Sequence, residues 1–226
     1  MLIPLEDLIA RHGLEIDGVL HLGAHTGEEA EAYHRNGVGE VFWVEGNPKL
    51  MPVLIEHLRP FSEQCAFNAL VADESGKEIT FHISSNDTTP AHAVDHQSSS
   101  ILELGTHLQS SPDVYFSEDI TCTSTTVDDL VAEKGIEDFN FINLDLQGAE
   151  LLALKGATFY LDWVDYIYTE VNEREVYVGC VLIGDLDAFL AKWGFSRVET
   201  AWAGQAGWGD ALYVKSQPVD CEEVLP

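Results

Sequence analysis

The stretch Gly18-Val-Leu-His-Leu-Gly-Ala-His-Thr-Gly-Glu-Glu29 decides the fold. Its apolar run 18–22 predicts a buried strand, and the glycine-bounded loop 23–27 leads into a helix pattern at 28–36. The two glutamates fall in the first turn of that helix, where the helix dipole favours carboxylates. A second apolar run at 41–44 and a second helix pattern at 48–58 repeat the unit. This strand–helix alternation predicts parallel strands joined by right-handed crossovers.

The same alternation continues to the end of the chain. Periodicity predicts a helix at 2–12, strands at 66–71, 79–83, 120–126, 139–144 and 164–171, further helices beginning near 127 and spanning 148–154 and 182–193, and a hairpin of 195–199 with 211–214. We therefore expect one α/β domain over 1–226, built on a doubly wound, Rossmann-like sheet of about seven strands. Segment 84–119 lacks periodicity, which favours a functional loop or lid. The polar tail 216–226 is expected to fray.

Composition excludes several classes of function. The 226 residues include 11 Lys and Arg against 39 Asp and Glu, a formal net charge of −28, so binding to nucleic acid or to an anionic membrane surface is disfavoured. Apolar runs are far shorter than the roughly 20 residues of a membrane helix, and the first residues show no secretory signal. Four dispersed cysteines predict buried thiols in a reducing cytosol, hence a cytoplasmic protein. The sequence leaves the oligomeric state open.

Ligands of doubly wound sheets bind beyond the carboxyl ends of the strands, so residues that directly follow strands are candidates. Glycines in the first loop would let the backbone approach a ligand closely. Glu45 follows 22 residues after Gly23, and a carboxylate there can accept both hydroxyls of a ribose. The pattern predicts a nucleoside-containing cofactor, with a plain tight turn and a solvated acid as the structural alternative. The candidate cofactor-binding residues are Gly23, Ala24, His25, Thr26, Gly27, Glu45, Gly46, Asn47, Val71 and Asp145.

The loop also discriminates between cofactors. A dinucleotide-binding G-x-G-x-x-G loop needs glycine where His25 stands, and no Lys or Arg lies nearby to meet a pyrophosphate. S-adenosylmethionine suits the acidic surroundings better, because it carries a ribose without phosphate and a sulfonium cation. A nucleotide-dependent oxidoreductase and a non-catalytic binding module are the alternatives from other classes.

Several stretches resemble the FkbM family of methyltransferases. Two of them, His21-Leu-Gly-Ala-His-Thr-Gly-Glu-Glu29 and Trp43-Val-Glu-Gly-Asn-Pro48, look like its cofactor loops. The most diagnostic is Asn143-Leu-Asp-Leu-Gln-Gly-Ala-Glu-Leu-Leu-Ala-Leu-Lys-Gly-Ala157, and Thr125-Thr-Val-Asp-Asp-Leu130 and Tyr168-Thr-Glu-Val-Asn172 also match. The resemblance implies a class I S-adenosylmethionine-dependent fold whose last strand is antiparallel. It also implies O-methylation of sugar or secondary-metabolite hydroxyls. The chain departs from the family at Asn143, where a basic residue is frequent, and segment 84–119 is matched only weakly.

Asp145, Glu170 and Asn172 are the candidate catalytic residues. Asp145 follows the central strand, where it could act as acid or base, orient the acceptor, or cap the helix near Gly148. Glu170 and Asn172 end the neighbouring strand. The three oxygen-bearing side chains could bind acceptor hydroxyls, or hold a divalent metal such as Mg²⁺ or Mn²⁺. For Glu150 we expect a structural role, in which it accepts hydrogen bonds from loop amides.

The acceptor side is expected to include His96, Tyr177, Trp208 and Asp210. Trp208 and Asp210 would offer a sugar an apolar platform beside a hydroxyl-binding acid, with hairpin packing as the alternative. His92, His96 or His107 could serve as base. The acidity of the chain favours a neutral acceptor. The predicted function is S-adenosylmethionine-dependent O-methylation of a sugar residue in a glycan or glycosylated small molecule, with a non-sugar secondary metabolite as the alternative acceptor.

Overall fold

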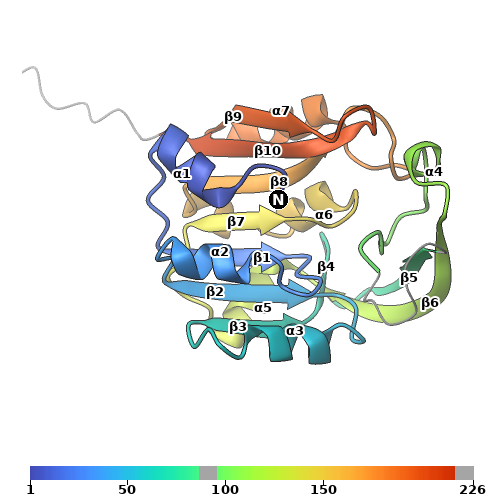
Figure 1. Cartoon of the computed structure of the whole chain (residues 1–226), viewed down its shortest axis with the longest axis horizontal. Coiled ribbons are helices and arrows are strands. Elements are labelled where there is room, and N and C mark those ends of the chain that lie inside the picture. The colour runs from blue at the N-terminus through green and yellow to red at the C-terminus, as the bar shows by residue number, and fades with distance from the viewer. Residues whose placement is uncertain (87–95, 217–226) are drawn as a thin grey trace, which may run out of the picture.

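A seven-stranded mixed sheet forms the centre of the molecule (Figure 1). The computed structural model describes residues 1–86 and 96–216, so all but the first residue of the expected tail lies outside it. In chain order the strands are β1 (Gly18–Leu22), β2 (Glu40–Glu45), β3 (Gln64–Asn68), β7 (Phe141–Leu144), β8 (Tyr166–Asn172), β9 (Phe195–Trp202) and β10 (Trp208–Lys215). They lie in the order β3-β2-β1-β7-β8-β10-β9, and β10 alone runs in the direction opposite to the other six. The predicted fold class and the antiparallel last strand are confirmed.

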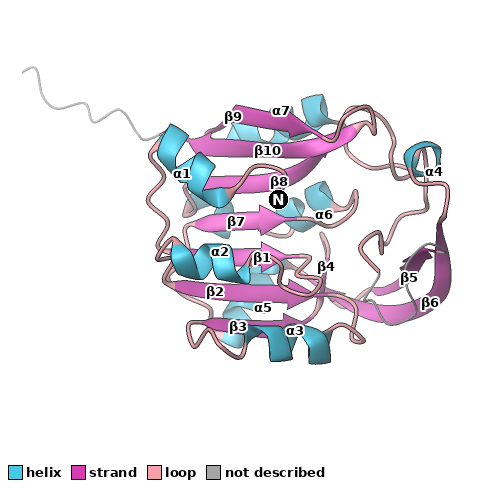
Figure 2. Cartoon of the chain, viewed as in Figure 1, coloured by secondary structure: helices cyan, strands magenta, loops and turns pink. Residues whose placement is uncertain are grey.

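Helices cover both faces of this sheet (Figure 2). One face carries α1 (Leu5–His12), α2 (Ala30–Arg35) and α3 (Met51–Leu58). The other carries α5 (Val127–Lys134), α6 (Glu150–Lys155) and α7 (Ile183–Leu190), with short 3₁₀ turns η1 (Tyr160–Asp162) and η2 (Ala191–Trp193). The start of α5 shows how sequence sets the boundaries, because the Thr126 hydroxyl accepts the Asp129 amide and Gly135 ends the helix in the left-handed conformation.

Two hydrophobic cores hold these layers together. Alternate residues of β1 show the arrangement: Val19 faces the core under α1–α3, whereas Leu20 faces the core under α5–α7. Trp43 and Tyr33 are the largest fully buried side chains of the first core. Each such side chain contributes about 1.5–3 kcal/mol through burial. Both faces are thereby occupied by packing, which leaves the ends of the strands to form a site.

The expectation of an irregular lid over 84–119 is wrong at both ends. A second sheet of three strands, in the order β4-β6-β5, is made by β4 (Leu70–Val71), β5 (Glu78–Asn86) and β6 (Val114–Thr125), and α4 (His107–Ser110) lies between the last two. The predicted strands 79–83 and 120–126 lie in β5 and β6, where apolar residues alternate towards a small core. The missed parts are 84–86 and 114–119, since most of 115–119 is exposed and lacks this alternation. Residues 87–95, which include His92, lie outside the described part of the chain.

Two smaller expectations also changed. The apolar stretch 66–71 is divided between β3 and β4, which belong to different sheets. Buried thiols are wrong for Cys65, which is exposed because β3 is the edge strand of the large sheet, whereas Cys180 is buried and Cys122 is half-buried. Across residues 1–86 and 96–216, no helix has the length and apolar character needed to span a bilayer.

Candidate active site

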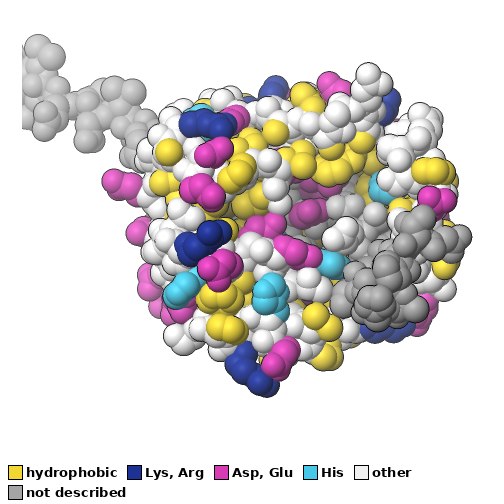
Figure 3. All heavy atoms as spheres, viewed as in Figure 1, with side chains coloured by type: hydrophobic (Ala, Val, Ile, Leu, Met, Phe, Trp, Pro, Cys, Tyr) yellow, Lys and Arg dark blue, Asp and Glu magenta, His cyan; other side chains and the backbone are white. Residues whose placement is uncertain are grey.

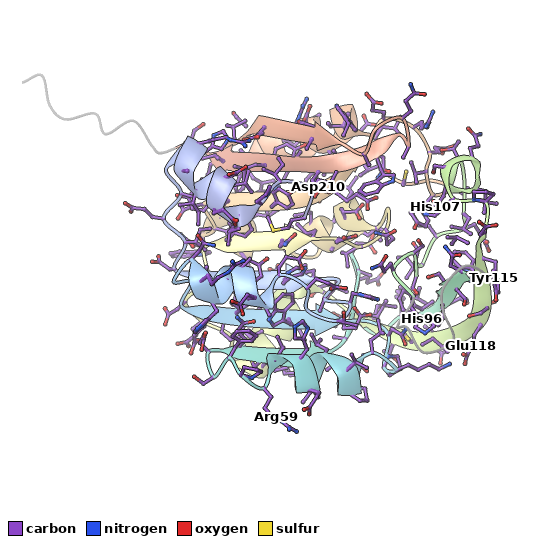
Figure 4. The ribbon with its side chains drawn as sticks, viewed as in Figure 1. Arg59, His96, His107, Tyr115, Glu118 and Asp210 are labelled. Carbon is purple, nitrogen blue, oxygen red and sulfur yellow. The ribbon has the colours of Figure 1, made fainter. Side chains whose placement is uncertain are left out.

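A cavity of about 660 Å³ lies beyond the carboxyl ends of β1, β2, β7 and β8. The second sheet and α4 face these strand ends and close the far side of the cavity (Figure 1). Asp210 stands on the large-sheet side, and His96 and His107 stand across from it (Figure 4). The cavity therefore joins the expected cofactor loops to the expected acceptor side.

Gly23 allows the loops after β1 and β7 to touch. Its φ of +86° is in the left-handed region, and a Cβ at this position would lie 1.9 Å from the backbone oxygen of Asp145. The Gly23 and Ala24 amides donate to the Val44 carbonyl at 2.9 and 3.0 Å, which fixes the loop against the end of β2. A glycine is therefore required here for the contact with the Asp145 backbone, and Gly23 also lines the cavity.

Glu45 is held by the backbone on both sides of its carboxylate. Its Oε2 accepts the His25 amide at 2.8 Å, and its Oε1 accepts the Asn47 amide at 2.7 Å. The side chain is only 6% exposed, yet it lines the cavity. Burial raises the pKa of Glu45 to about 7, against the opposing effect of these two amides. A carboxylate fixed in this way keeps lone pairs for the hydroxyls of a ligand.

The other cofactor-loop residues divide into lining and supporting residues. Ala24, His25, Gly46 and Val71 line the cavity, as Gly23 and Glu45 do, whereas Thr26, Gly27 and Asn47 lie behind it. The Thr26 hydroxyl donates to Glu28 at 2.9 Å, and Gly27 packs against Leu54 of α3. His25 itself adopts a φ of +45°, and its ring nitrogen Nδ1 lies within hydrogen-bond distance of Glu28. Burial acts to raise the pKa of Glu28, but the hydrogen bond and charge of His25, together with the bonds from the backbone and from Thr26, outweigh it and lower the pKa to about 2.

Asp145 lies at the base of the cavity, at the end of the central strand β7. Its side chain is open to the cavity, and its backbone amide donates to the Leu22 carbonyl at 2.9 Å. The depth of the site removes bulk water and raises the pKa of Asp145 to about 6, and the charge of Asp210 acts in the same direction. Helix α6 begins after Ala149 with no side-chain cap, so Asp145 does not have the alternative capping role. An accessible carboxylate with a pKa near neutrality is suited to accept a proton.

Glu170 is joined to Asp145 by the side chain of Gln147. The Gln147 amide nitrogen donates to Asp145 Oδ1, and to Glu170 Oε2 at 3.0 Å. Burial raises the pKa of Glu170 well above its ordinary value, and the charges of Glu150 and Asp145 add to this effect. Asn172 is fully buried and does not line the cavity. The structure thus unites two members of the expected oxygen trio and places the third behind the wall.

These residues do not fit a divalent cation. The facing oxygens of Asp145 and Glu170 are occupied by N–H donors of Gln147, whose partial positive charge repels a metal ion. In the described ranges 1–86 and 96–216, no three or more His, Cys, Asp and Glu side chains are grouped so that they could hold one. The expected structural role of Glu150 is confirmed, because its Oε1 accepts the amides of Leu146 and Gly148, each at 3.0 Å.

The expected acceptor residues all line the cavity. Tyr177 and Trp208 form part of its wall, and Trp208 is half-buried. Asp210 also anchors the start of the chain, since its Oδ2 accepts the Leu2 amide and the Tyr168 hydroxyl, both at 2.6 Å. This long-range contact brings Met1 into the cavity wall, which the sequence gave no signal to predict.

Two histidines face the large sheet from the side of the ribbon. His96 has a φ of +87°, and its Nδ1 donates to the Ser84 carbonyl at 2.5 Å, which leaves Nε2 as the acceptor nitrogen of the neutral ring. His107 is 7% exposed, its Nε2 lies 3.3 Å from the Ser98 hydroxyl, and burial lowers its pKa. Among the residues that the sequence did not single out, Gln147 has the clearest role. Its only signal was its place between Asp145 and Glu150.

The cavity is strongly acidic. All 11 Lys and Arg residues lie in the described ranges, and none of them lines it. Figure 3 shows acidic side chains gathered in the hollow of this face, with Lys and Arg around its periphery. Six carboxyl side chains contribute to the lining: Glu28, Glu29, Glu45, Asp145, Glu170 and Asp210.

Relatives with known structures share this fold. Magnesium protoporphyrin IX methyltransferase from Synechocystis PCC 6803, solved with bound SAH, superposes with a TM-score of 0.52 over 92% of this chain and 78% of its own, at 10% identity. The fibrillarin pre-rRNA processing protein of Methanococcus jannaschii gives a TM-score of 0.51 over 88% of this chain and 66% of its own, at 11% identity. At such identities the likeness establishes the fold alone, which is that of class I methyltransferases.

Sequence comparison is more specific. The 2-O-methyltransferase NoeI of Sinorhizobium fredii (strain NBRC 101917 / NGR234) is 29% identical over 162 residues, which are 71% of this chain and 65% of that protein. The match thus spans slightly less than two thirds of the relative's length. The family model described as the Methyltransferase FkbM domain matches residues 21–197, well over half of the chain. The protein therefore belongs to the FkbM methyltransferase family.

Proposed function

We propose that this protein transfers a methyl group from S-adenosylmethionine to a hydroxyl of a sugar residue, in a glycan or a glycosylated small molecule. The position of Asp145 carries the proposal. It is a cavity-exposed carboxylate with a raised pKa, in backbone contact with the glycine loop, and it lines the same cavity as Trp208. The family, and a relative named as a 2-O-methyltransferase, support transfer to oxygen.

The residues present fit S-adenosylmethionine. The Glu45 carboxylate, fixed by two amides, can accept the two ribose hydroxyls. The Asn68 side chain and the Ala69 amide both donate to the Glu45 carbonyl, at 2.7 and 3.1 Å, which brings the apolar Leu70 and Val71 beside it as a surface for adenine. The surrounding carboxylates tolerate the sulfonium and ammonium charges of the cofactor.

The acceptor is uncharged. A phosphate or sulfate group would meet six carboxyl side chains and no Lys or Arg in the cavity wall. A sugar suits this wall, because Trp208 offers a ring for its apolar face while Asp210 and His96 Nε2 can accept from its hydroxyls. A hydroxylated secondary metabolite without a sugar could donate to the same two side chains, but it has fewer hydroxyls than a sugar to use them.

When bound, S-adenosylmethionine supplies a methyl group on a good leaving group. The chain's part is to align the acceptor oxygen and to take its proton. Alignment of two reactants provides roughly 7–11 kcal/mol, and a positioned base provides a rate factor of about 10²–10⁴. Asp145 is the base, because its oxygen that Gln147 does not bind faces the cavity. Burial raises the pKa of Glu170 well above its ordinary value, so this carboxyl holds its proton more strongly than an exposed glutamate does.

Methyl transfer from isotopically labelled S-adenosylmethionine to a panel of neutral glycosides tests the proposal, with Asp145→Asn as the matched variant. We expect labelled product with wild-type protein, and turnover about 10²–10⁴-fold lower in the variant. The affinity for S-adenosylhomocysteine should stay within about threefold, because Asn keeps the size of the side chain. Binding of S-adenosylhomocysteine without methylation of any glycoside would contradict the sugar assignment. Failure to bind it would contradict methyl transfer altogether.

A further inference from the structure

Gln147 connects two acidic side chains, Asp145 and Glu170. Its single amide nitrogen donates one hydrogen to Asp145 Oδ1 and the other to Glu170 Oε2. Both carboxyl groups line the cavity, as does Gln147 itself. Both hydrogens of the amide are therefore used, and they fix the positions of the two carboxyl groups relative to each other.

The orientation of this amide is fixed by a hydrogen bond to its oxygen. The buried Tyr177 hydroxyl donates to Gln147 Oε1 at 2.6 Å, so the amide oxygen faces Tyr177 and the nitrogen faces the carboxyl groups. The backbone is held as well, because the Ser100 hydroxyl donates to the Gln147 carbonyl at 2.8 Å. Gln147 also adopts a φ of +52°, a conformation in which few residues other than glycine are found unless their surroundings impose it.

We propose that Gln147 is a positioning residue that stands in for a divalent cation between Asp145 and Glu170, so that this site works without a metal ion. The amide supplies the two positive hydrogens that orient the carboxyl groups and directs the other oxygen of Asp145 to the cavity. A cation placed between Asp145 and Glu170 would displace the amide and break its bond to Tyr177. The catalytic consequence rests on the proposed function, whereas the preference of the site against metal does not.

The Gln147→Glu variant tests this inference directly. It replaces the amide with a third carboxylate and creates an oxygen-rich set, with Asp145 and Glu170, of the kind that binds Mg²⁺ and Mn²⁺. The matched control is Gln97→Glu, which adds the same charge to the cavity lining at a different place. Mn²⁺ binding is measured by electron paramagnetic resonance and by thermal melting of the full chain.

We expect the Gln147→Glu variant to bind Mn²⁺ at least tenfold more tightly than wild type and Gln97→Glu. Wild-type binding of Mn²⁺ as tight as that of Gln147→Glu would overturn the inference. So would a folded Gln147→Glu protein that gains no Mn²⁺ affinity, because the amide would then not be what keeps the cation out.

A second variant covers the case in which Gln147→Glu does not fold. Tyr177→Phe keeps every carboxyl group and removes only the anchor of the amide. Its turnover should fall at least tenfold with unchanged affinity for S-adenosylhomocysteine, and neither EDTA nor Mg²⁺ should alter the wild-type rate. A wild-type rate that EDTA abolishes and Mg²⁺ restores would refute the inference. If S-adenosylhomocysteine does not bind at all, the proposed function fails, but the Mn²⁺ comparison still decides the role of Gln147.

Discussion

Replacing Glu45 by Gln should weaken cofactor binding and remove its pH dependence. The carboxylate accepts the His25 and Asn47 amides with different oxygens, so both oxygens are already oriented when a ligand arrives. Gln keeps the shape but has one acceptor oxygen, and its NH₂ group must face one of the two amides. Loss of a charged acceptor typically costs about 2–3 kcal/mol. We therefore expect the Kd for S-adenosylhomocysteine to rise about 30- to 150-fold.

The pH profile makes the prediction specific. Burial raises the pKa of Glu45 to about 7 in the free protein, and ribose hydroxyls donate to the ionised form. Wild-type affinity should therefore be full above pH 7 and fall about tenfold for each unit below it. Isothermal titration calorimetry between pH 6 and pH 8 measures this profile. Asp145 and Glu150 also titrate near this range. Because both proteins contain them, their effects cancel when the Kd of Glu45→Gln is divided by the Kd of wild type at each pH.

Glu28→Gln is the matched control for this experiment. Glu28 also lines the cavity, but its pKa is lowered to about 2, so it stays ionised throughout the titration. Its replacement should leave the slope of affinity against pH unchanged. Equal Kd values for wild type and Glu45→Gln at pH 8, or the same slope in both, would refute the assignment of Glu45 to the ribose.

Three further changes test the architecture. Gly23→Ala should lower the free energy of unfolding by about 3 kcal/mol or more, because its Cβ would meet the Asp145 carbonyl, whereas Gly13→Ala, with a similar φ and open space, should lose only about 1 kcal/mol in the same urea titration. Buried Glu150, with a pKa raised from 4.5 to about 7, should make stability fall as pH rises through that range, and Glu150→Gln should remove about 3 kcal/mol of the difference between pH 5 and pH 8. Tyr168→Phe removes the acceptor of the Ile3 amide but leaves the bond from Leu2 to Asp210, so hydrogen exchange should become faster at the Ile3 amide without loss of the global fold.

The fold was predictable because its central strands are buried on both faces. Strands such as β1 and β7 appear in the sequence as continuous apolar runs, and the loops after them are bounded by glycine and acidic residues. The β5–β6 ribbon was predicted only in part: 79–83 and 120–126 show the alternation of a strand, whereas the order of 84–86 and 114–119 follows mainly from pairing between the two strands. Such pairing is a long-range property that local periodicity does not encode.

The candidate site shows the same division. Glu45, Asp145 and Glu170 were found because each lies at or next to the carboxyl end of a strand, and all three line the cavity. The expectation that residues at strand ends line the site fails for Asn172, which follows Glu170 by two residues but is fully buried behind the cavity wall. Gln147 was missed because its role depends on Tyr177 and Glu170, distant residues that only the folded chain brings to it.

The insertion of β10 between β8 and β9 sets an order for the assembly of the protein. During synthesis β9 leaves the ribosome before β10, and because β10 is its only neighbour in the sheet, β9 cannot take its final place until β10 has been made. The nascent chain can complete the glycine loop, Glu45 and Asp145 before then, but Trp208 and Asp210 arrive with the last strand. The part of the cavity proposed to bind the cofactor can thus form before Trp208 and Asp210 complete the wall proposed to bind the acceptor.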